Sequence, residues 1–229
     1  MAADIRWLGH SAFHLSGAGA DVLIDPFLTG NPKAAAAAGE VPADVIALTH
    51  GHGDHIGDTV DIAKRTGAKV LAIVELAAEI EGDGVGDVVG FNYGGTVTFD
   101  WGWIKMVPAW HTAVSPKGTP HMPAGLLIHY GGHLIYHLGD TALFSDLQLI
   151  AGRGDRVELA LVPIGGHYTM DRYDAVTAVE LINPSQVIPI HYNTMPQIET
   201  DAQAFKDDVQ NAGFSQVYVL EPGDSHTLK

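Results

Sequence analysis

The chain has 229 residues, 46% of them hydrophobic and 17% charged, which suits one folded domain with a full core. Its net charge of −15 comes from 27 acidic and 12 basic residues, so the basic surfaces that bind nucleic acid are not expected. The absence of cysteine excludes disulfides and thiolate ligands. No apolar run reaches the roughly 18 residues of a membrane span, and no secretory signal is visible, so we expect a cytoplasmic protein.

The first half of the sequence predicts short strands and one helix. Strands are expected where apolar runs are bounded by Gly and Asp turns, over residues 5–8, 12–15, 22–24 and 44–48. Residues 59–65 predict a helix, because Asp58 can cap its start and Gly67 follows its basic end. The alanine tract 34–38 predicts a short helical loop.

The middle of the sequence is dominated by strands, and the last third alternates. Strands are expected over residues 96–99, 103–108, 126–130 and 134–138, with a hairpin turn at Gly131 and Gly132. Helices are then expected over 143–150, 174–182 and 202–211, and strands over 159–162, 186–190 and 217–220. Strand-rich halves with a few interleaved helices predict an α/β fold in which two sheets pack face to face with helices outside.

A cluster of potential metal ligands follows the apolar run 45–48. Four ligand groups fall within six positions: His50, His52, Asp54 and His55. Imidazole nitrogen and carboxylate oxygen bind borderline divalent ions at about 2.0–2.2 Å. Glycines at positions 51 and 53 allow the loop to turn tightly around an ion. This spacing indicates a metal site.

Further candidate ligands occur where other predicted strands end, which is where protein scaffolds carry chemistry. They are Asp25, His111, Asp140 and His191. In this order, and with the cluster after residue 48, they resemble the five motifs of the metallo-β-lactamase superfamily over almost the whole chain. Short segments such as Trp7-Leu8-Gly9-His10 and His191-Tyr192-Asn193 resemble those of one branch of the superfamily, which consists of largely uncharacterised metal-dependent hydrolases. That branch lies near the ascorbate-6-phosphate lactonases and, more distantly, the N-acylphosphatidylethanolamine phospholipases.

The resemblance implies a four-layer αββα sandwich of two mixed β-sheets flanked by helices, as a single domain over residues 1–229. It also implies two divalent ions per chain, of zinc, manganese, nickel or iron. The first ion would be held by His50, His52 and His111, and the second by Asp54, His55 and His191. Asp140 would bridge both ions, and Asp25 would orient a ligand imidazole. A hydroxide between the ions would attack a small lactone, ester or phosphoester, with Asp54 among the catalytic residues.

Three more histidines are open to interpretation. His10 and His167 each lie in a glycine-containing loop after a predicted strand, outside the shared motifs. Each side chain either makes a structural hydrogen bond or contacts the substrate, and His167 is also a candidate proton donor to the leaving group. His121 lies in the loop 118–123, where solvent exposure is expected and substrate contact is the alternative.

The common β-lactamases carry Cys at the bridging position, so Asp140 argues against antibiotic hydrolysis. Two functions other than hydrolysis remain open. The same ligand set suits an iron-dependent redox enzyme similar to the superfamily's sulfur dioxygenases. The chain could also be a non-catalytic, metal-stabilised binding scaffold. The expected partner is a small-molecule substrate, and the lactonase-like relatives suggest a homo-oligomer.

Overall fold

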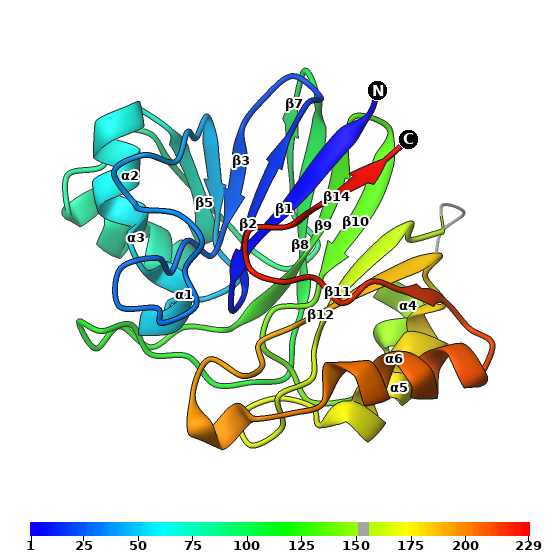
Figure 1. The fold of residues 1–229 in the computed structure, drawn as a ribbon. Coiled ribbons are helices and arrows are strands. Elements are labelled where there is room, and N and C mark those ends of the chain that lie inside the picture. The colour runs from blue at the N-terminus through cyan, green and yellow to red at the C-terminus, as the bar shows by residue number, and fades with distance from the viewer. Residues whose placement is uncertain (151–155) are drawn as a thin grey trace.

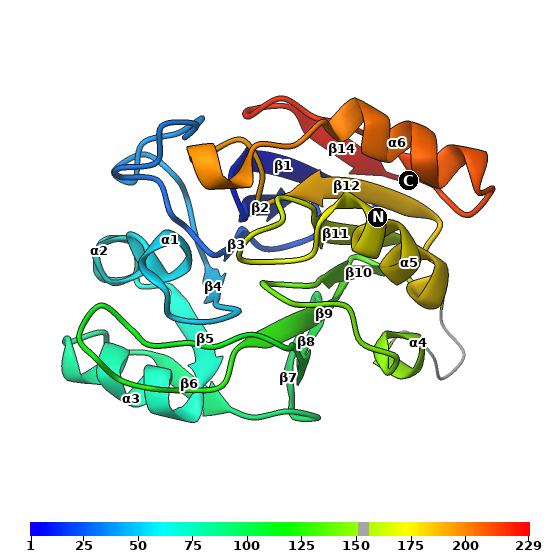
Figure 2. The same cartoon turned by 90° about the horizontal axis from the view of Figure 1, so that it is seen from below.

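The computed structural model describes residues 1–150 and 156–229. Within them, two seven-stranded sheets pack face to face, and helices cover their outer sides (Figure 1). The view from below shows α1 to α3 on one side of the two sheets and α4 to α6 on the other (Figure 2). The four-layer αββα sandwich expected from the sequence is therefore confirmed.

The first sheet has the order β14-β1-β2-β3-β4-β5-β6. Neighbours from β14 to β3 are antiparallel, and those from β3 to β6 are parallel. Its strands are β1 (Ala3–Gly9), β2 (Ala12–Ser16), β3 (Val22–Ile24), β4 (Val45–Ala47), β5 (Lys69–Ile73), β6 (Val88–Phe91) and β14 (Ser225–Leu228). Because β14 pairs with β1, the two chain ends lie near one another (Figure 1).

The second sheet has the order β13-β12-β11-β10-β9-β8-β7 and repeats the same division. Neighbours from β7 to β10 are antiparallel, and those from β10 to β13 are parallel. Its strands are β7 (Thr96–Phe99), β8 (Gly102–Pro108), β9 (Ala124–Tyr130), β10 (His133–His137), β11 (Leu159–Pro163), β12 (Gln186–Ile190) and β13 (Gln216–Val217).

The helices each bury one face against a sheet. They are α1 (Gly53–Ile56), α2 (Thr59–Thr66), α3 (Val74–Gly82), α4 (Leu147–Ile150), α5 (Arg172–Ile182), α6 (Ala202–Asn211) and a 3₁₀ turn, η1 (Pro196–Ile198). One buried cluster joins the two sheets and contains Phe13, Tyr130 and Tyr136. A second joins β4 and β5 to α2 and α3 through residues such as Ile62 and Leu76. Burial of each such side chain contributes about 1.5–3 kcal/mol.

The strand directions bring the candidate ligands to one edge. In the first sheet β1, β3 and β4 run the same way, since β2 is antiparallel to both β1 and β3. In the second sheet β8, β10 and β12 also run the same way. Each of these six strands ends just before a candidate ligand or its loop. The six strands therefore end on the same side of the sandwich, which faces the viewer when the molecule is seen from below, while the long loop after β8 continues outward over α3 (Figure 2).

Some expected elements are wrong or shorter. The tract 34–38 is not helical but forms an irregular loop with bends, because so short a segment does not offset the cost of helix nucleation. Within 143–150 only Leu147–Ile150 is helical, since Ala142 is tied to Trp110 by a backbone hydrogen bond. The strand expected over 217–220 is shorter, since β13 covers only Gln216 and Val217, and one further backbone hydrogen bond joins Tyr218 N–H to the carbonyl of Val187 in β12. Asp58 does not cap α2, because its Oδ2 accepts hydrogen bonds from the backbone N–H groups of Leu28 and Thr29.

Six other elements were not predicted at all, namely α1, β5, α3, β6, η1 and β14. In the described part of the chain, none of the helices combines the length and the apolar character that crossing a membrane requires.

Candidate metal centre

The segment after β4 turns back on itself within three residues. His50 is fully buried and His52 is partly exposed on either side of Gly51. A Cβ at Gly51 would lie 2.7 Å from Leu76 Cδ1 and 2.8 Å from His121 Cε1, so a larger residue here would force one of these two side chains to move. The backbone N–H of Gly51 donates a hydrogen bond of 2.8 Å to His121 Nε2. The turn brings His50 Nε2 to 3.0 Å from His52 Nδ1, so these two nitrogens are close enough to bind the same ion.

Asp140, after β10, lies at the centre of four imidazoles. Its Oδ1 is 3.3 Å from His55 Nε2. Its Oδ2 is 3.2 Å from His191 Nε2, 3.6 Å from His111 Nε2 and 3.9 Å from His50 Nε2. Two ligand atoms of one tetrahedral ion, each about 2.05 Å from it, are about 3.3 Å apart. The separations from His191 and His55 match this value, and those from His111 and His50 are a few tenths of an ångström longer.

The candidate ligand atoms form two groups, within each of which they lie no more than 4.8 Å apart. One group is His50, His52, His111 and Asp140, and the other is His10, Asp54, His55 and His191. His55 Nε2, His191 Nε2 and Asp140 Oδ1 are buried without a hydrogen-bond partner among the described residues. Buried lone pairs are costly when unpaired. A divalent cation would satisfy them, so the residues present fit metal ions.

Asp25 and Thr49 set which nitrogen of two histidines is available. Asp25 Oδ2 accepts hydrogen bonds from Thr49 Oγ1 at 2.6 Å and from His55 Nδ1 at 2.8 Å. His55 therefore carries its proton on Nδ1 and turns the Nε2 lone pair toward Asp140. Since the Thr49 hydroxyl donates to Asp25, it accepts from His50 Nδ1 at 3.0 Å. His50 Nε2 is thus also left with a free lone pair.

The pKa shifts of the histidines agree with a metal centre in two ways. Burial lowers the pKa of His50, His52 and His111, which keeps these rings in the neutral form that binds metal. Burial opposes charge on His55 too, but Asp140 and Asp25 outweigh it and raise the pKa of His55. The carboxylates therefore favour a positive charge at this point, which a bound ion would supply.

An open cleft of about 480 Å³ gives access to the cluster. Its walls include His52, Asp54, His111, Asp140 and His191, together with Thr112, Tyr168 and Met195. A small molecule in this cleft would meet the ligand side chains directly.

His10 does not line this cleft. It is fully buried, and its Nε2 is 3.1 Å from Asp54 Oδ2 while its Nδ1 is 2.9 Å from Thr194 Oγ1. Burial and the neighbouring His191 lower the pKa of His10 to about 4. Although burial opposes it, the hydrogen bond with His10 keeps the pKa of Asp54 below its usual range. With both nitrogens engaged, His10 suits the positioning of Asp54 better than substrate contact.

His167 lies on the loop after β11 and is exposed. The adjacent Tyr168 lines the cleft, whereas His167 is not among the lining residues. His121 was expected to be exposed, but it is buried, and this expectation was wrong. Its Nδ1 donates to the carbonyl of Thr119 at 3.0 Å, which leaves Nε2 to accept from Gly51. Only the fold reveals this contact, because the two residues are 70 positions apart.

Comparisons with known proteins agree with this geometry. Residues 4–191 match the family described as a beta-lactamase superfamily domain. A UPF0173 metal-dependent hydrolase of Thermus thermophilus is 48% identical over 222 residues, covering 96% of this chain and 97% of the relative. The structure of Igni18, a metallo hydrolase from Ignicoccus hospitalis, is 37% identical with a TM-score of 0.90, over 100% of this chain and 99% of that one. CmlA, a diiron β-hydroxylase from Streptomyces venezuelae, shares the fold at 17% identity and a TM-score of 0.74, over 99% of this chain and 54% of that one.

Proposed function

This chain belongs to the β-lactamase superfamily and is one of its metal-dependent hydrolases, and we propose that it uses two metal ions to cleave a small lactone, ester or phosphoester. The observation that carries the proposal is the position of Asp140. Imidazole nitrogens from both candidate ligand groups lie within 4 Å of this one carboxylate. His55 Nε2 is near Oδ1, and the Nε2 atoms of His50, His111 and His191 are near Oδ2. A carboxylate can serve two ions at once, whereas a neutral imidazole serves one.

In this proposal His50, His52 and His111 hold one ion, and Asp54, His55 and His191 hold the other, with Asp140 between them. When bound, two such ions supply a hydroxide at neutral pH and positive charge against the reacting oxygens. The protein's part is to fix the ligands, through Asp25 and Thr49 for the buried rings and through His10 for Asp54.

The cleft supports a small substrate. Tyr168 and Met195 offer it apolar contact beside the polar ligand residues. His167 remains our candidate for the proton that a leaving alkoxide needs. It is exposed and adjacent to Tyr168, so this role requires the loop to turn its ring toward the cleft.

An iron-dependent redox enzyme is the competing proposal, because imidazole and carboxylate ligands suit iron as well as zinc or manganese. The two proposals differ in what each metal supports. Redox chemistry needs iron and oxygen, whereas hydrolysis proceeds with redox-inert zinc.

The test loads metal-free protein with zinc, manganese, nickel or iron in separate samples. Bound metal is counted, and turnover is measured on a panel of lactones, esters, thioesters and phosphodiesters. We expect about two ions per chain and hydrolysis of at least one class with zinc or manganese. Turnover with iron and oxygen alone would support the redox enzyme instead. Two bound ions with no turnover of any kind would favour the binding scaffold, and a plateau at one ion would overturn the dinuclear site.

A further inference from the structure

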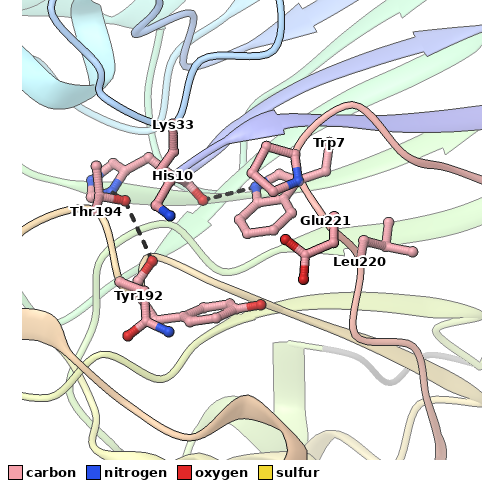
Figure 3. A pocket seen from close by; sticks show the side chains of 9 residues that line it. Trp7, His10, Lys33, Tyr192, Thr194, Leu220 and Glu221 are labelled. Carbon is pink, nitrogen blue, oxygen red and sulfur yellow. Dashed lines mark hydrogen bonds between the residues drawn. The ribbon is translucent and has the colours of Figure 1, made fainter.

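A second cavity, of about 90 Å³, lies behind His10 and shares no lining residue with the cleft at the candidate metal centre. Figure 3 shows the side chains that surround it, which come from four separate segments of the chain. Trp7 and Tyr192 form aromatic walls, with ring centroids 5.6 Å apart and planes inclined by 23°. Leu220 and Pro222 add apolar surface, and Lys33 and Glu221 add one charge of each sign.

The backbone holds these walls in place. A Cβ at Gly9, which has φ of 103°, would lie 2.5 Å from the carbonyl oxygen of Lys33, so the loop carrying Lys33 packs against a glycine. On the other side, the backbone N–H of Gly223 donates to the carbonyl of Trp7 at 2.8 Å. The backbone N–H of Trp7 donates to the carbonyl of Asp224 at 3.0 Å. The C-terminal segment with Leu220 to Pro222 is thereby fastened beside Trp7.

The charged groups are available to a ligand. Lys33 and Glu221 are both exposed, and neither forms an ion pair with any residue in 1–150 or 156–229. In Figure 3 the two side chains come from different loops, and the Glu221 carboxylate extends toward Trp7 and Tyr192.

We propose that this cavity binds a small zwitterion of the amino-acid type. The ligand carboxylate would pair with Lys33, its ammonium group would pair with Glu221, and its short apolar part would lie against Trp7 and Tyr192. A simple anion would meet the Glu221 carboxylate and a simple cation would meet Lys33, so a ligand with both charges fits better than either. An ammonium near aromatic rings gains further attraction.

The size of the cavity limits the ligand. At roughly 30 Å³ for each water, it holds about three waters, or the body of a molecule such as glycine, alanine or β-alanine. For so few atoms a dissociation constant of about 1 mM is the expected range. This site is independent of the proposed hydrolytic activity, and its test needs no turnover.

The test uses the full chain and follows the indole N–H signal of Trp7 by heteronuclear NMR. The titrants are glycine, alanine and β-alanine, with propionate and ethylamine as probes that keep one charge each. The test variants are Lys33→Gln and Glu221→Gln. Lys206→Gln and Glu40→Gln serve as controls, because these exposed or partly exposed charges do not line the cavity. Metal content is measured in every variant and should match the unaltered protein.

We expect saturable binding of at least one zwitterion, and binding about 10-fold or more weaker in each test variant, since each loses a charged hydrogen-bond partner. The controls should bind as the unaltered protein does. Absence of saturable binding would overturn the proposal. So would equal binding of a singly charged probe, or binding that neither test variant weakens. None of these results depends on whether the protein hydrolyses an ester.

Discussion

Asp25→Asn tests whether the metal centre depends on the proton position of one buried ring. In the structure Asp25 accepts three hydrogen bonds, from the backbone N–H and the hydroxyl of Thr49 and from His55 Nδ1. An Asn that keeps the backbone contact with its oxygen would turn its NH₂ group toward His55 Nδ1–H. Two donors would then face each other, and the ring could relieve the conflict only by moving its proton to Nε2. That proton would occupy the nitrogen needed for the metal.

The magnitude follows from the role of such supporting contacts. Loss of a partner that orients a ligand histidine costs about 10- to 100-fold in metal affinity, which is about 1.4–2.7 kcal/mol. We expect this loss at the ion held by His55, Asp54 and His191. The other ion loses less, because Thr49 can still accept from His50. Titration against a competing chelator would therefore show one weakened site.

A matched control is Asp44→Asn. Asp44 precedes β4 at the end remote from the ligand loop, and its Oδ2 accepts a hydrogen bond from the backbone N–H of Asp21. The Asp44→Asn substitution should therefore leave the affinity of both metal sites unchanged. If Asp25→Asn also bound both ions with unaltered affinity, the proposed orientation of His55 would be refuted.

Four further predictions concern single residues. Asp140→Ala should lose metal at both sites while the chain stays folded, as metal analysis and circular dichroism would show, and full metal retention would contradict the bridging role. His167→Ala should retain both ions but lose about 10²–10⁴-fold in kcat on an alkyl ester, with a smaller loss on a nitrophenyl ester; equal losses would indicate positioning. His121→Ala should weaken metal binding about 10-fold by removing the acceptor of the Gly51 N–H, and His121→Gln should restore part of it. Burial lowers the pKa of His137, so this ring binds less proton in the folded state than in the unfolded state below about pH 6.5. In metal-free protein this one imidazole should therefore contribute a loss of up to about 1.4 kcal/mol of stability per pH unit as the pH falls, and denaturation of His137→Gln should show a pH dependence that is flatter by that amount.

The strand ends were the most predictable part of the molecule. Short runs rich in apolar residues located the strands β3, β7 and β12 with the bounds that the structure has, and the helix α6 was also predicted with its observed bounds. Since a run of this kind must end in a loop, the polar residue that follows it is a candidate ligand before any contact is known. Asp25, Asp140 and His191 were identified in this way, and the parallel strand directions explain why they converge.

The elements that were missed lack such local signals. Residues 70–80 are apolar apart from Glu75 and Glu79, so a strand and the helix after it cannot be separated by periodicity alone. β14 is a short polar strand at a sheet edge, and only its pairing with β1 makes it a strand. The contact of His121 with Gly51 likewise depends on tertiary structure, because no local pattern relates the two residues.

Backbone strain connects the fold to the candidate centre. Six non-glycine residues in the described chain have positive φ, and His10, Asp25 and His191 are among them, at 56°, 44° and 54°. Such conformations cost of order 1–3 kcal/mol each and persist only where surrounding contacts fix them. Each of these three residues follows a strand, and the left-handed backbone turns the chain sharply there. The backbone N–H of His191 donates to the carbonyl of His10 at 3.1 Å, which joins the two sheets at this turn. The packing of two full sheets therefore maintains the strained turns that place His10 beside His191 and Asp25 beside His55. A loop without that support would relax and separate these side chains.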